Sequence, residues 1–323
     1  MEKWKKQFRE EMPICEHWAY FDHAAVAPIT KSAHNAIRHW SDQALGEGDV
    51  NWLQWSKGVE RTRNSAARLI GATVEEIALI RSTTEGISFV AEGFPWQSGD
   101  NVVTLDNEFP SNCYPWLNLK SRGVETRRVS TVAGGVDLDS LAQACDSRTR
   151  IVSVSWVGYV SGWRCDVAEL AELAHSHGAL LMLDAIQGLG VFPLDVRETD
   201  IDFLAADGHK WMLGPEGAGI LYLKREHLDL LRPLQVGWNS VKQAHDFSHI
   251  KLDLKDSAAR YEAGSQNMAG MLTWVPALRN CLNLVFLASR KRCCESAIHW
   301  RMNCWKMALS LIRHARDDIV LAS

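Results

Sequence analysis

Short apolar runs alternate with amphipathic stretches along the chain from about residue 76 onward. The runs are rich in β-branched residues and are typical of buried strands. They are EIALI (76–80), NVVTLD (101–106), VETRRVS (124–130), RIVSVSW (150–156), ALLMLD (179–184), DFLAAD (202–207) and GAGILYL (217–223). Residues 111–122, 137–145 and 166–178 have the apolar spacing of helices. Gly178 ends the last of these, where a helix C-terminus favours glycine.

This alternation predicts an α/β fold with a seven-stranded, mostly parallel sheet covered by helices on both faces. Ligands of such sheets bind beyond the carboxyl ends of the strands. Residues 30–70 are mainly helical in pattern, and residues 237–253 form an irregular stretch. We expect an N-terminal segment (1–20), a large domain (21–240) and a partial small domain (241–323).

Composition and charge narrow the class of protein. The 323 residues are 46% hydrophobic and 23% charged, which is typical of a soluble globular protein. A net charge of −4 gives no reason to expect nucleic acid or an anionic membrane as a partner. The first residues are charged and lack the apolar core of a signal peptide, and no apolar run is long enough to span a membrane. We therefore expect a cytoplasmic protein.

The cysteines do not indicate a disulfide framework or a metal site. Eight cysteines without a secretion signal are typical of reduced thiols. Cys293, Cys294, His299 and Cys304 lack the paired-ligand spacing of structural zinc sites. We expect no metal.

Polar residues follow several of the predicted strands. Lys210 stands between an apolar run and a glycine-rich loop, and Asp184 ends the preceding strand. An aldehyde cofactor captured by a lysine needs an amine that is neutral often enough to attack. A pyridine ring acting as an electron sink needs a carboxylate beside its nitrogen. Asp184 fits that role, Gln187 is placed to donate to a ring hydroxyl, and Phe109 is the aromatic residue expected to cover the ring.

The segment after the first strand is suited to a phosphate group. Backbone N–H groups at a helix N-terminus bind phosphate, and Ser82 with Glu85 matches a capping box at such a terminus. Thr83 and Thr84 add hydroxyl groups. Each strand end is a weak signal alone, but together they specify one kind of ligand.

These residues occur within an ordered set of motifs that resembles the class V aminotransferase family of pyridoxal-phosphate enzymes. That family includes cysteine desulfurases, selenocysteine lyases, isopenicillin N epimerase-like proteins and kynureninases. The resemblance covers about three quarters of the chain. Its motifs are YFDHAAVAP (20–28), STTEGISFVAEG (82–93), EFPSNCYPW (108–116), LDAIQGLG (183–190), DGHKWMLGPEGAG (207–219) and RYEAGSQNMAG (260–270).

The resemblance implies a type I fold of pyridoxal-phosphate transferases and pyridoxal 5′-phosphate as cofactor. It implies that Lys210 is the catalytic lysine that forms the Schiff base. It also implies a set of cofactor-binding residues, which are Thr83, Thr84, Phe109, Asn112, Asp184, Gln187 and His209. Ser265 stands where relatives have a threonine that reaches the phosphate of the neighbouring subunit, and Trp238 is expected to line the partner's pocket. A homodimer with shared active sites follows from that.

Two positions depart from the desulfurase pattern. Cysteine desulfurases stack a histidine on the ring, whereas residues 108–112 contain none and resemble the phenylalanine-containing loop of kynureninases. Tyr159 stands near the position of a desulfurase asparagine. Both departures weigh against a desulfurase.

The end of the chain departs further. The family's small domain supplies an arginine for the substrate carboxylate, and the resemblance fades after about Leu287. From Ala288 there are seven Lys or Arg against three Asp or Glu. Three interpretations fit: a frameshift or truncation, a short form that kept the cofactor but lost catalysis, and a divergent native helix. Surface positions are favoured over a carboxylate anchor for Arg301, Arg313 and Arg316, so no anchor is assigned.

Three hypotheses follow. The first is an enzyme acting on an amino acid, class V aminotransferase-like or a desulfurase or other lyase. The second is a cofactor-binding protein without turnover, motivated by the incomplete small domain. The third, a solvent-exposed Lys210 on an unrelated α/β fold, is disfavoured by the ordered motifs. The sequence specifies neither the substrate nor the type of reaction.

Overall fold

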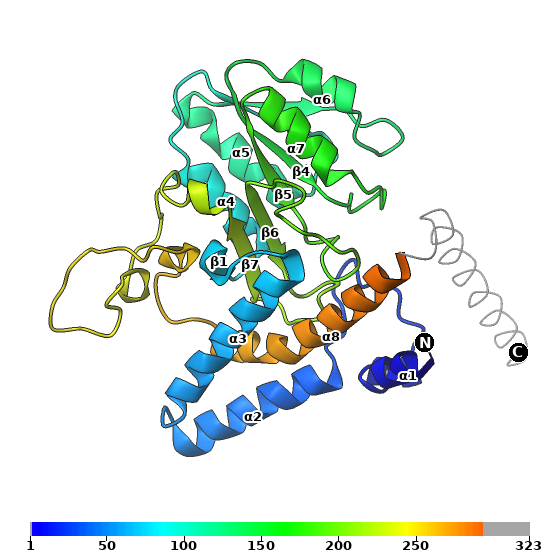
Figure 1. Ribbon diagram of the computed structural model, residues 1–323, viewed down its shortest axis with the longest axis vertical. Coiled ribbons are helices and arrows are strands. Elements are labelled where there is room, and N and C mark those ends of the chain that lie inside the picture. The colour runs from blue at the N-terminus through cyan, green and yellow to red at the C-terminus, as the bar shows by residue number, and fades with distance from the viewer. Residues whose placement is uncertain (1, 293–323) are drawn as a thin grey trace, which may run out of the picture. The chain divides into compact units, whose positions relative to one another are not determined.

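The computed structural model describes residues 2–292, and the element labels follow Figure 1. Residues Met1–Leu282 form one compact unit, and Asn283–Ser323 are grouped apart from it. The domain boundaries expected at residues 20 and 240 stay predictions. The cysteine–histidine set 293–304 and the three arginines considered as carboxylate anchors lie outside the described residues.

All seven predicted strands are confirmed within two residues of their expected bounds. They are β1 (Ile77–Ile80), β2 (Asn101–Leu105), β3 (Glu125–Val129), β4 (Thr149–Ser155), β5 (Leu180–Asp184), β6 (Phe203–Asp207) and β7 (Gly219–Leu223). They form a single sheet in the order β1-β7-β6-β5-β4-β2-β3. Only β7 runs antiparallel to its neighbours, so six strands point their carboxyl ends toward the same edge.

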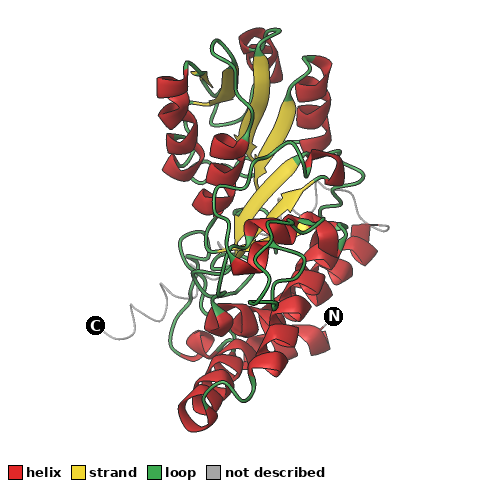
Figure 2. Cartoon of the chain, turned by 90° about the vertical axis from the view of Figure 1, so that its left-hand side faces the viewer, coloured by secondary structure: helices red, strands yellow, loops and turns green. Residues whose placement is uncertain are grey.

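Helices cover both faces of this sheet, as predicted (Figures 1 and 2). The described α-helices are α1 (Glu2–Glu10), α2 (Lys31–Glu47), α3 (Trp52–Ile70), α4 (Thr83–Gly93), α5 (Tyr114–Asn118), α6 (Leu138–Ala144), α7 (Val167–Ser176) and α8 (Met268–Arg292). The helix expected over 111–122 is wrong in length, because only Tyr114–Asn118 is α-helical and tighter 3-10 turns flank it. Gly178, one residue past the C-cap His177 of α7, has φ +73°, as the C-terminus of a helix favours. No described helix is long and apolar enough to cross a bilayer.

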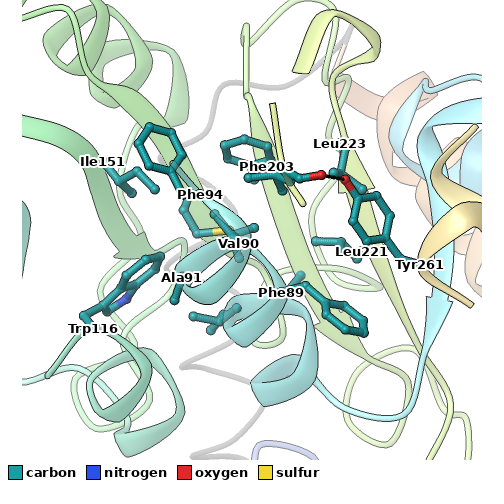
Figure 3. Close-up of a cluster of buried hydrophobic side chains, with 14 of the residues drawn as sticks. Phe89, Val90, Ala91, Phe94, Trp116, Ile151, Phe203, Leu221, Leu223 and Tyr261 are labelled. Atoms are coloured by element: carbon teal, nitrogen blue, oxygen red, sulfur yellow. Dashed lines mark hydrogen bonds between the residues drawn. The ribbon is translucent and has the colours of Figure 1, made fainter. Parts of the chain in front are cut away.

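The buried core lies between α4 and the strands beneath it. Phe89 and Val90 of α4 pack with Phe203 of β6 and Leu221 of β7, together with Trp116 from α5 (Figure 3). Burying such side chains contributes about 1.5–3 kcal/mol each to folding. This contact fixes α4 on the sheet and therefore places the N-terminus of α4 at the sheet's carboxyl edge.

Gly86 permits this close approach of α4. A Cβ atom at Gly86 would lie 2.8 Å from the Cβ of Ala205 in β6, closer than packed atoms come. Since the helix and the strand meet at a glycine, the backbone of α4 sits directly against β6. The first turn of α4 is thereby held beside the end of the strand that leads to Lys210.

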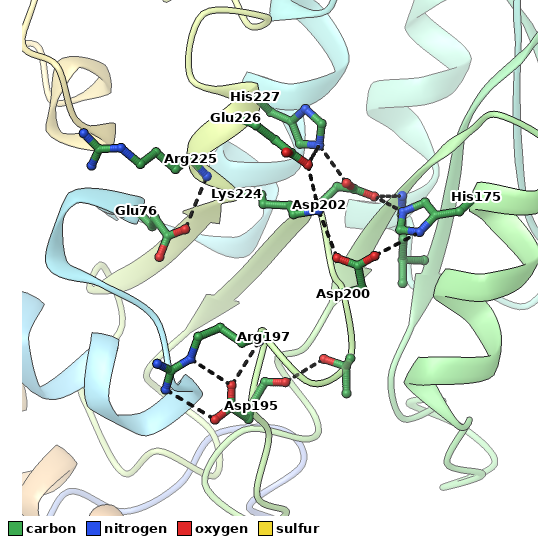
Figure 4. A network of polar contacts seen from close by, with 12 residues as sticks. Glu76, His175, Asp195, Arg197, Asp200, Asp202, Lys224, Arg225, Glu226 and His227 are labelled. Atoms are coloured by element: carbon green, nitrogen blue, oxygen red, sulfur yellow. Dashed lines mark hydrogen bonds and ion pairs between the residues drawn. The ribbon is translucent and has the colours of Figure 1, made fainter.

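A polar network closes the opposite end of β6. Asp202, which precedes β6, is 1% exposed and accepts hydrogen bonds from His175 Nε2 (2.8 Å), His227 Nε2 (2.7 Å) and the Leu181 N–H (2.7 Å) (Figure 4). These contacts lower the pKa of Asp202 against the opposing effect of its burial. The network ties α7 and the turn after β7 to the sheet.

The same network contains atoms of the types that ligate metals. Oxygens of Asp202 and Glu226 and a nitrogen of His227 lie within 4.8 Å of one another. However, Lys224 Nζ lies 2.7 Å from Glu226 Oε1 and 2.9 Å from Asp200 Oδ1. Lys224 already supplies positive charge to Glu226, and the Glu226 and Asp200 side chains are exposed, so these contacts are ion pairs at the protein surface.

Candidate active site

Lys210 lies three residues beyond the end of β6 and is 8% exposed. The backbone around it is held on two sides: the Gly208 N–H donates to Ala218 O (2.8 Å), and the Ala27 N–H donates to His209 O (2.8 Å). Lys210 is therefore not the solvent-exposed turn lysine that the sequence motifs already disfavoured. Its position is set jointly by β7 and by the N-terminal segment 20–28.

The electrostatic surroundings of Lys210 favour a neutral amine more than water does. Burial lowers the pKa of Lys210, against the opposing attraction of Asp184 and Asp207. Within residues 2–292, no carboxylate oxygen is recorded as an ion-pair partner of Lys210 Nζ. A buried lysine without a close counter-ion is suited to nucleophilic attack.

Asp184 ends β5, the strand beside β6, and is 2% exposed. Burial raises its pKa to about 6, while the Ile186 N–H (3.1 Å from Oδ1) and the charge of Lys210 lower it. Two buried groups that can carry opposite charges thus lie at or just beyond the ends of adjacent strands, where the sequence predicted them. Each makes the charged form of the other more favourable.

Gln187 lies in the turn after β5, and both ends of its amide have protein partners. Its Nε2 donates to Ala24 O (2.9 Å), and its Oε1 accepts from Trp211 Nε1 (2.8 Å). Trp211 in turn stacks on His23 at 5.4 Å between ring centroids. Gln187 therefore connects the N-terminal segment to the residue that follows Lys210, a structural role that the sequence did not suggest.

The N-terminus of α4 adjoins the Lys210 segment. Ser82 caps the helix by accepting from the Glu85 N–H (3.1 Å), as predicted. The other half of the predicted capping box is wrong, because the Glu85 carboxylate accepts from the Arg81 N–H (2.6 Å) instead of the Ser82 N–H. Thr83 is buried and its Oγ1 accepts from the Asp207 N–H (2.9 Å), whereas Thr84 is exposed and donates to Ser111 Oγ (2.7 Å).

His209 and Asp207 carry buried polar atoms without hydrogen-bond partners. His209 Nδ1 lies 3.2 Å from Asp207 Oδ1, but neither atom makes a well-aligned hydrogen bond to the described residues. Buried polar groups in proteins are nearly always satisfied. These two atoms therefore suit a site that receives a polar ligand.

The segment after β2 covers Lys210. The ring centroid of Phe109 lies 5.5 Å from Lys210 Nζ. The Phe109 and Tyr159 rings pack in a T-shaped arrangement with their centroids 5.2 Å apart. Asn112 is fully buried and accepts from Ser153 Oγ (2.6 Å) and Trp116 Nε1 (3.1 Å). Phe109 is thus next to the lysine, as expected, while the Asn112 carbonyl oxygen is used within the protein.

Ser265 and Trp238 lie at a second place on the chain. They line a cavity of about 390 Å³ whose walls also include Arg63, Lys255 and Glu262, and Lys210 is not among its lining residues. Arg63 and Glu262 form a buried ion pair, and Glu262 accepts from the Leu79 N–H of β1 (2.9 Å). Within one chain, these two residues do not join the group around Lys210.

Glu108 belongs to the site and was not predicted. It is 7% exposed, and its pKa is raised to about 7, mainly by burial and further by the charge of Asp184. Its carboxylate accepts from the N–H and the hydroxyl of Ser155. A signal was available, since Glu108 follows β2 by three residues at the edge where ligands of parallel sheets bind.

Comparison with known proteins supplies the context for this arrangement. Residues 19–299 match the family model described as aminotransferase class-V. The chain is 34% identical over 269 residues to a probable cysteine desulfurase of Methanothermobacter thermautotrophicus, covering 82% of this chain and 66% of that protein. It is 31% identical over 285 residues to the cysteine desulfurase CsdA of Escherichia coli, covering 84% and 70% respectively.

Solved structures agree with the fold. The apo structure of cysteine desulfurase from Thermococcus onnurineus matches with a TM-score of 0.77 and 26% identity, covering 87% of this chain and 71% of that one. Escherichia coli CsdA matches with a TM-score of 0.76 and 29% identity, covering 85% and 70%. The chain thus spans about two thirds of the length of the curated relatives it matches.

Proposed function

The chain belongs to the class V aminotransferase family, and we propose that it is a pyridoxal-phosphate-dependent enzyme that acts on an amino acid. The observation that carries the proposal is the pair formed by buried Lys210 and buried Asp184 at the ends of adjacent strands. The type I fold, with its seven-stranded sheet, is the fold of this family. Its cofactor is pyridoxal 5′-phosphate.

The residues present fit this cofactor. Lys210 is buried with a lowered pKa, and unsatisfied polar atoms of Asp207 and His209 lie beside it. Lys210 would bind the aldehyde carbon covalently, Asp184 would hold the proton of the ring nitrogen, and Phe109 would cover the ring. The N-terminus of α4 would take the phosphate through backbone N–H groups and the Thr83 and Thr84 hydroxyls, with His209 nearby.

When bound, pyridoxal phosphate supplies an electron-withdrawing ring that stabilises negative charge on the substrate's α-carbon. Lys210 Nζ, whose pKa burial lowers, would be the base that takes the α-proton. Asp184 in its charged form would keep the ring nitrogen protonated. Phe109 keeps water away from the face that it covers.

Cysteine is the amino acid to test first. The curated relatives at 34% and 31% identity are named cysteine desulfurases. Phe109 in place of the desulfurase histidine argues for a different path of proton transfer. Cys113, Cys165 and Cys281 are buried and burial raises their pKa values, so their thiols stay protonated and are unsuited to accept sulfur.

A homodimer in the cytoplasm is the proposed state of the enzyme. Support comes from Ser265, which is exposed, and Trp238, which is 38% exposed, at a cavity apart from Lys210. Residues so placed are available to complete the site of a second copy. Two-fold symmetric dimers are the commonest oligomers, and they give each partner the same contribution.

The first experiment is a near-visible absorption spectrum of the purified protein with pyridoxal phosphate and a panel of amino acids, with Lys210→Ala as control. A lysine-bound cofactor band that cysteine shifts supports the proposal. Alanine as product indicates desulfuration, pyruvate with sulfide indicates C–S lyase activity, and a requirement for a keto acid indicates transamination. A band that no amino acid shifts supports a cofactor-binding protein without turnover. Attachment that persists in Lys210→Ala contradicts the assignment.

A further inference from the structure

Glu108 is a buried titratable group beside the candidate site that has no role in the chemistry described above. It precedes Phe109, whose ring lies against Lys210. Both oxygens of its carboxylate are used: Oε1 accepts from the Ser155 N–H at 2.7 Å, and Oε2 accepts from the Ser155 hydroxyl. One side chain thus makes a two-point connection between the segment after β2 and the end of β4.

Ser155, the residue that Glu108 contacts, is held in place by the sheet. Ser155 is the last residue of β4 and lies in register with Asp184, the last residue of β5. The next residue, Trp156, donates its N–H to Asp184 O at 2.9 Å. Glu108 is therefore anchored to the same strand ends that place Asp184.

The segment 106–113 is fixed at both of its ends. At its start, the Asp106 N–H donates to Val129 O of β3 (2.9 Å), and Asp106 O accepts from Arg128 Nη2. Its later part is fixed by Asn112, which accepts from Ser153 Oγ, and by Cys113, whose thiol lies 3.8 Å from Glu108 O. Phe109 itself is 43% exposed. Between Asp106, which is tied to β3, and Asn112, which is tied to β4, Glu108 is the residue that joins the part of the segment before Phe109 to the end of β4.

The cavity beside the Glu108 carboxylate is too small for a substrate to reach the carboxylate through it. The cavity lined by Glu108, Ser155 and Tyr159 measures about 10 Å³, room for one water at most. Glu108 therefore acts on neighbouring protein groups. The titratable groups that face it are Asp184, Cys113 and Cys165, and none of them is cationic.

We propose that Glu108 is a positioning residue, which ties residues 106–113 to the end of β4 and so holds Phe109 over Lys210. This inference rests on the proposed function, because it concerns the site that would hold pyridoxal phosphate.

Two substitutions distinguish the effect of the hydrogen bonds to Ser155 from the effect of the negative charge of Glu108. Glu108→Gln keeps an acceptor for the Ser155 N–H and places a donor toward the Ser155 hydroxyl, but it cannot ionise. Glu108→Ala removes the connection. Hydrogen exchange of residues 106–113 in the cofactor-free protein reports on the connection, and the dissociation constant of pyridoxal phosphate, from its absorption band, reports on the consequence.

For Glu108→Ala we expect about tenfold faster exchange in residues 106–113 and about tenfold weaker cofactor binding, the size of effect that losing one or two buried hydrogen bonds produces. Glu108→Gln should stay within about threefold of the wild type in both measurements. Asp202→Asn, at the far end of β6, controls for general loss of stability, and exposed Glu198→Gln controls for loss of a carboxylate. Both controls should leave residues 106–113 and cofactor binding unchanged.

Unchanged exchange in Glu108→Ala would overturn the proposal, as would faster exchange with unchanged cofactor binding. Equal losses in the alanine and glutamine variants would also overturn it, since the charge would then be what matters. If Glu108→Ala does not fold, Ser155→Ala removes one of the two hydrogen bonds from the other side and should show an intermediate effect. A wild type that binds no cofactor contradicts the proposed function instead, and the exchange data alone then decide the connection.

Discussion

The backbone N–H of Asp207 donates a hydrogen bond to Thr83 Oγ1 at 2.9 Å. This contact joins the first turn of α4, the proposed phosphate site, to the last residue of β6, three residues before Lys210. The two ends of the cofactor would thus be held by parts of the chain that are directly bonded to each other. The separation between phosphate site and lysine is set by backbone structure.

Replacing Thr83 tests this relationship. Thr83→Val keeps the shape but leaves the Asp207 N–H without its acceptor in a buried place, which we expect to cost about 1–3 kcal/mol of unfolding free energy. Cofactor binding should weaken in parallel, whereas Thr83→Ser should restore both. Urea unfolding and cofactor titration measure the two effects. A Thr83→Val protein with unchanged stability would show that the hydrogen bond contributes nothing.

Asp184→Asn separates attachment from turnover. An asparagine cannot keep the ring nitrogen protonated, so we expect the cofactor to bind Lys210 while kcat falls by about 100-fold or more, which is about 2.7 kcal/mol of the barrier. Absorbance and steady-state kinetics with the substrate found in the amino-acid panel check this. Asp184→Glu, which keeps the charge, should retain more activity. Equal activity of wild type and Asp184→Asn would remove Asp184 from the mechanism.

The stability of the cofactor-free protein should depend on Glu108 in a definite direction. Burial raises the pKa of Glu108 from 4.5 to about 7, so the folded state holds a proton that the unfolded state releases. The contribution of protonated Glu108 to the unfolding free energy is therefore complete below pH 4.5 and is lost as the pH rises through 7. Relative to Glu108→Gln, wild-type unfolding free energy should fall by on the order of 3 kcal/mol between pH 4.5 and 8. Parallel pH profiles from urea unfolding would contradict this.

Asp202→Asn should destabilise the fold without affecting the site. The carboxylate is 1% exposed and accepts from two imidazoles and one N–H, and an amide cannot accept at both ends. We expect a loss of about 3–5 kcal/mol, as is typical when one member of a buried ionic network is removed. Thermal unfolding measures it. A cofactor affinity that falls together with stability would mean that the two ends of β6 are coupled.

Mixed dimers test whether sites are shared. Lys210→Ala prevents attachment, and Ser265→Asp places a negative charge where the partner's phosphate is proposed to lie. Neither variant alone should be active. When the two variants are mixed in equal amounts and exchange subunits, half of the dimers are hybrids. Each hybrid has one intact site out of two, so about a quarter of wild-type activity should return. No recovery, in a mixture shown by mass spectrometry to contain hybrids, would indicate that each chain builds its own site.

Local patterning determined the elements of this protein. Six of the seven predicted runs became strands because they are mostly buried segments bounded by polar or glycine residues, and a parallel sheet buries such segments on both faces. The seventh, β3, lies at the edge of the sheet and only its last residue is buried. Asp184 and Lys210 were placed correctly for the same reason, since the carboxyl ends of parallel strands meet at one edge. The resemblance to a family added the cofactor, which no pattern of hydrophobic residues can specify.

Contacts between distant segments were decided only by the tertiary structure. Glu108 meets Ser155, Gln187 meets Ala24, and Thr83 meets the backbone of Asp207. Each of these bonds joins residues 47 or more positions apart. Hydrogen bonds of that kind depend on strand order and on the close seating of α4 at Gly86, and neither is encoded by the periodicity of a single segment. Glu85 is a local exception: its carboxylate accepts from the Arg81 N–H and pairs with the Arg81 side chain, one residue before its expected partner Ser82.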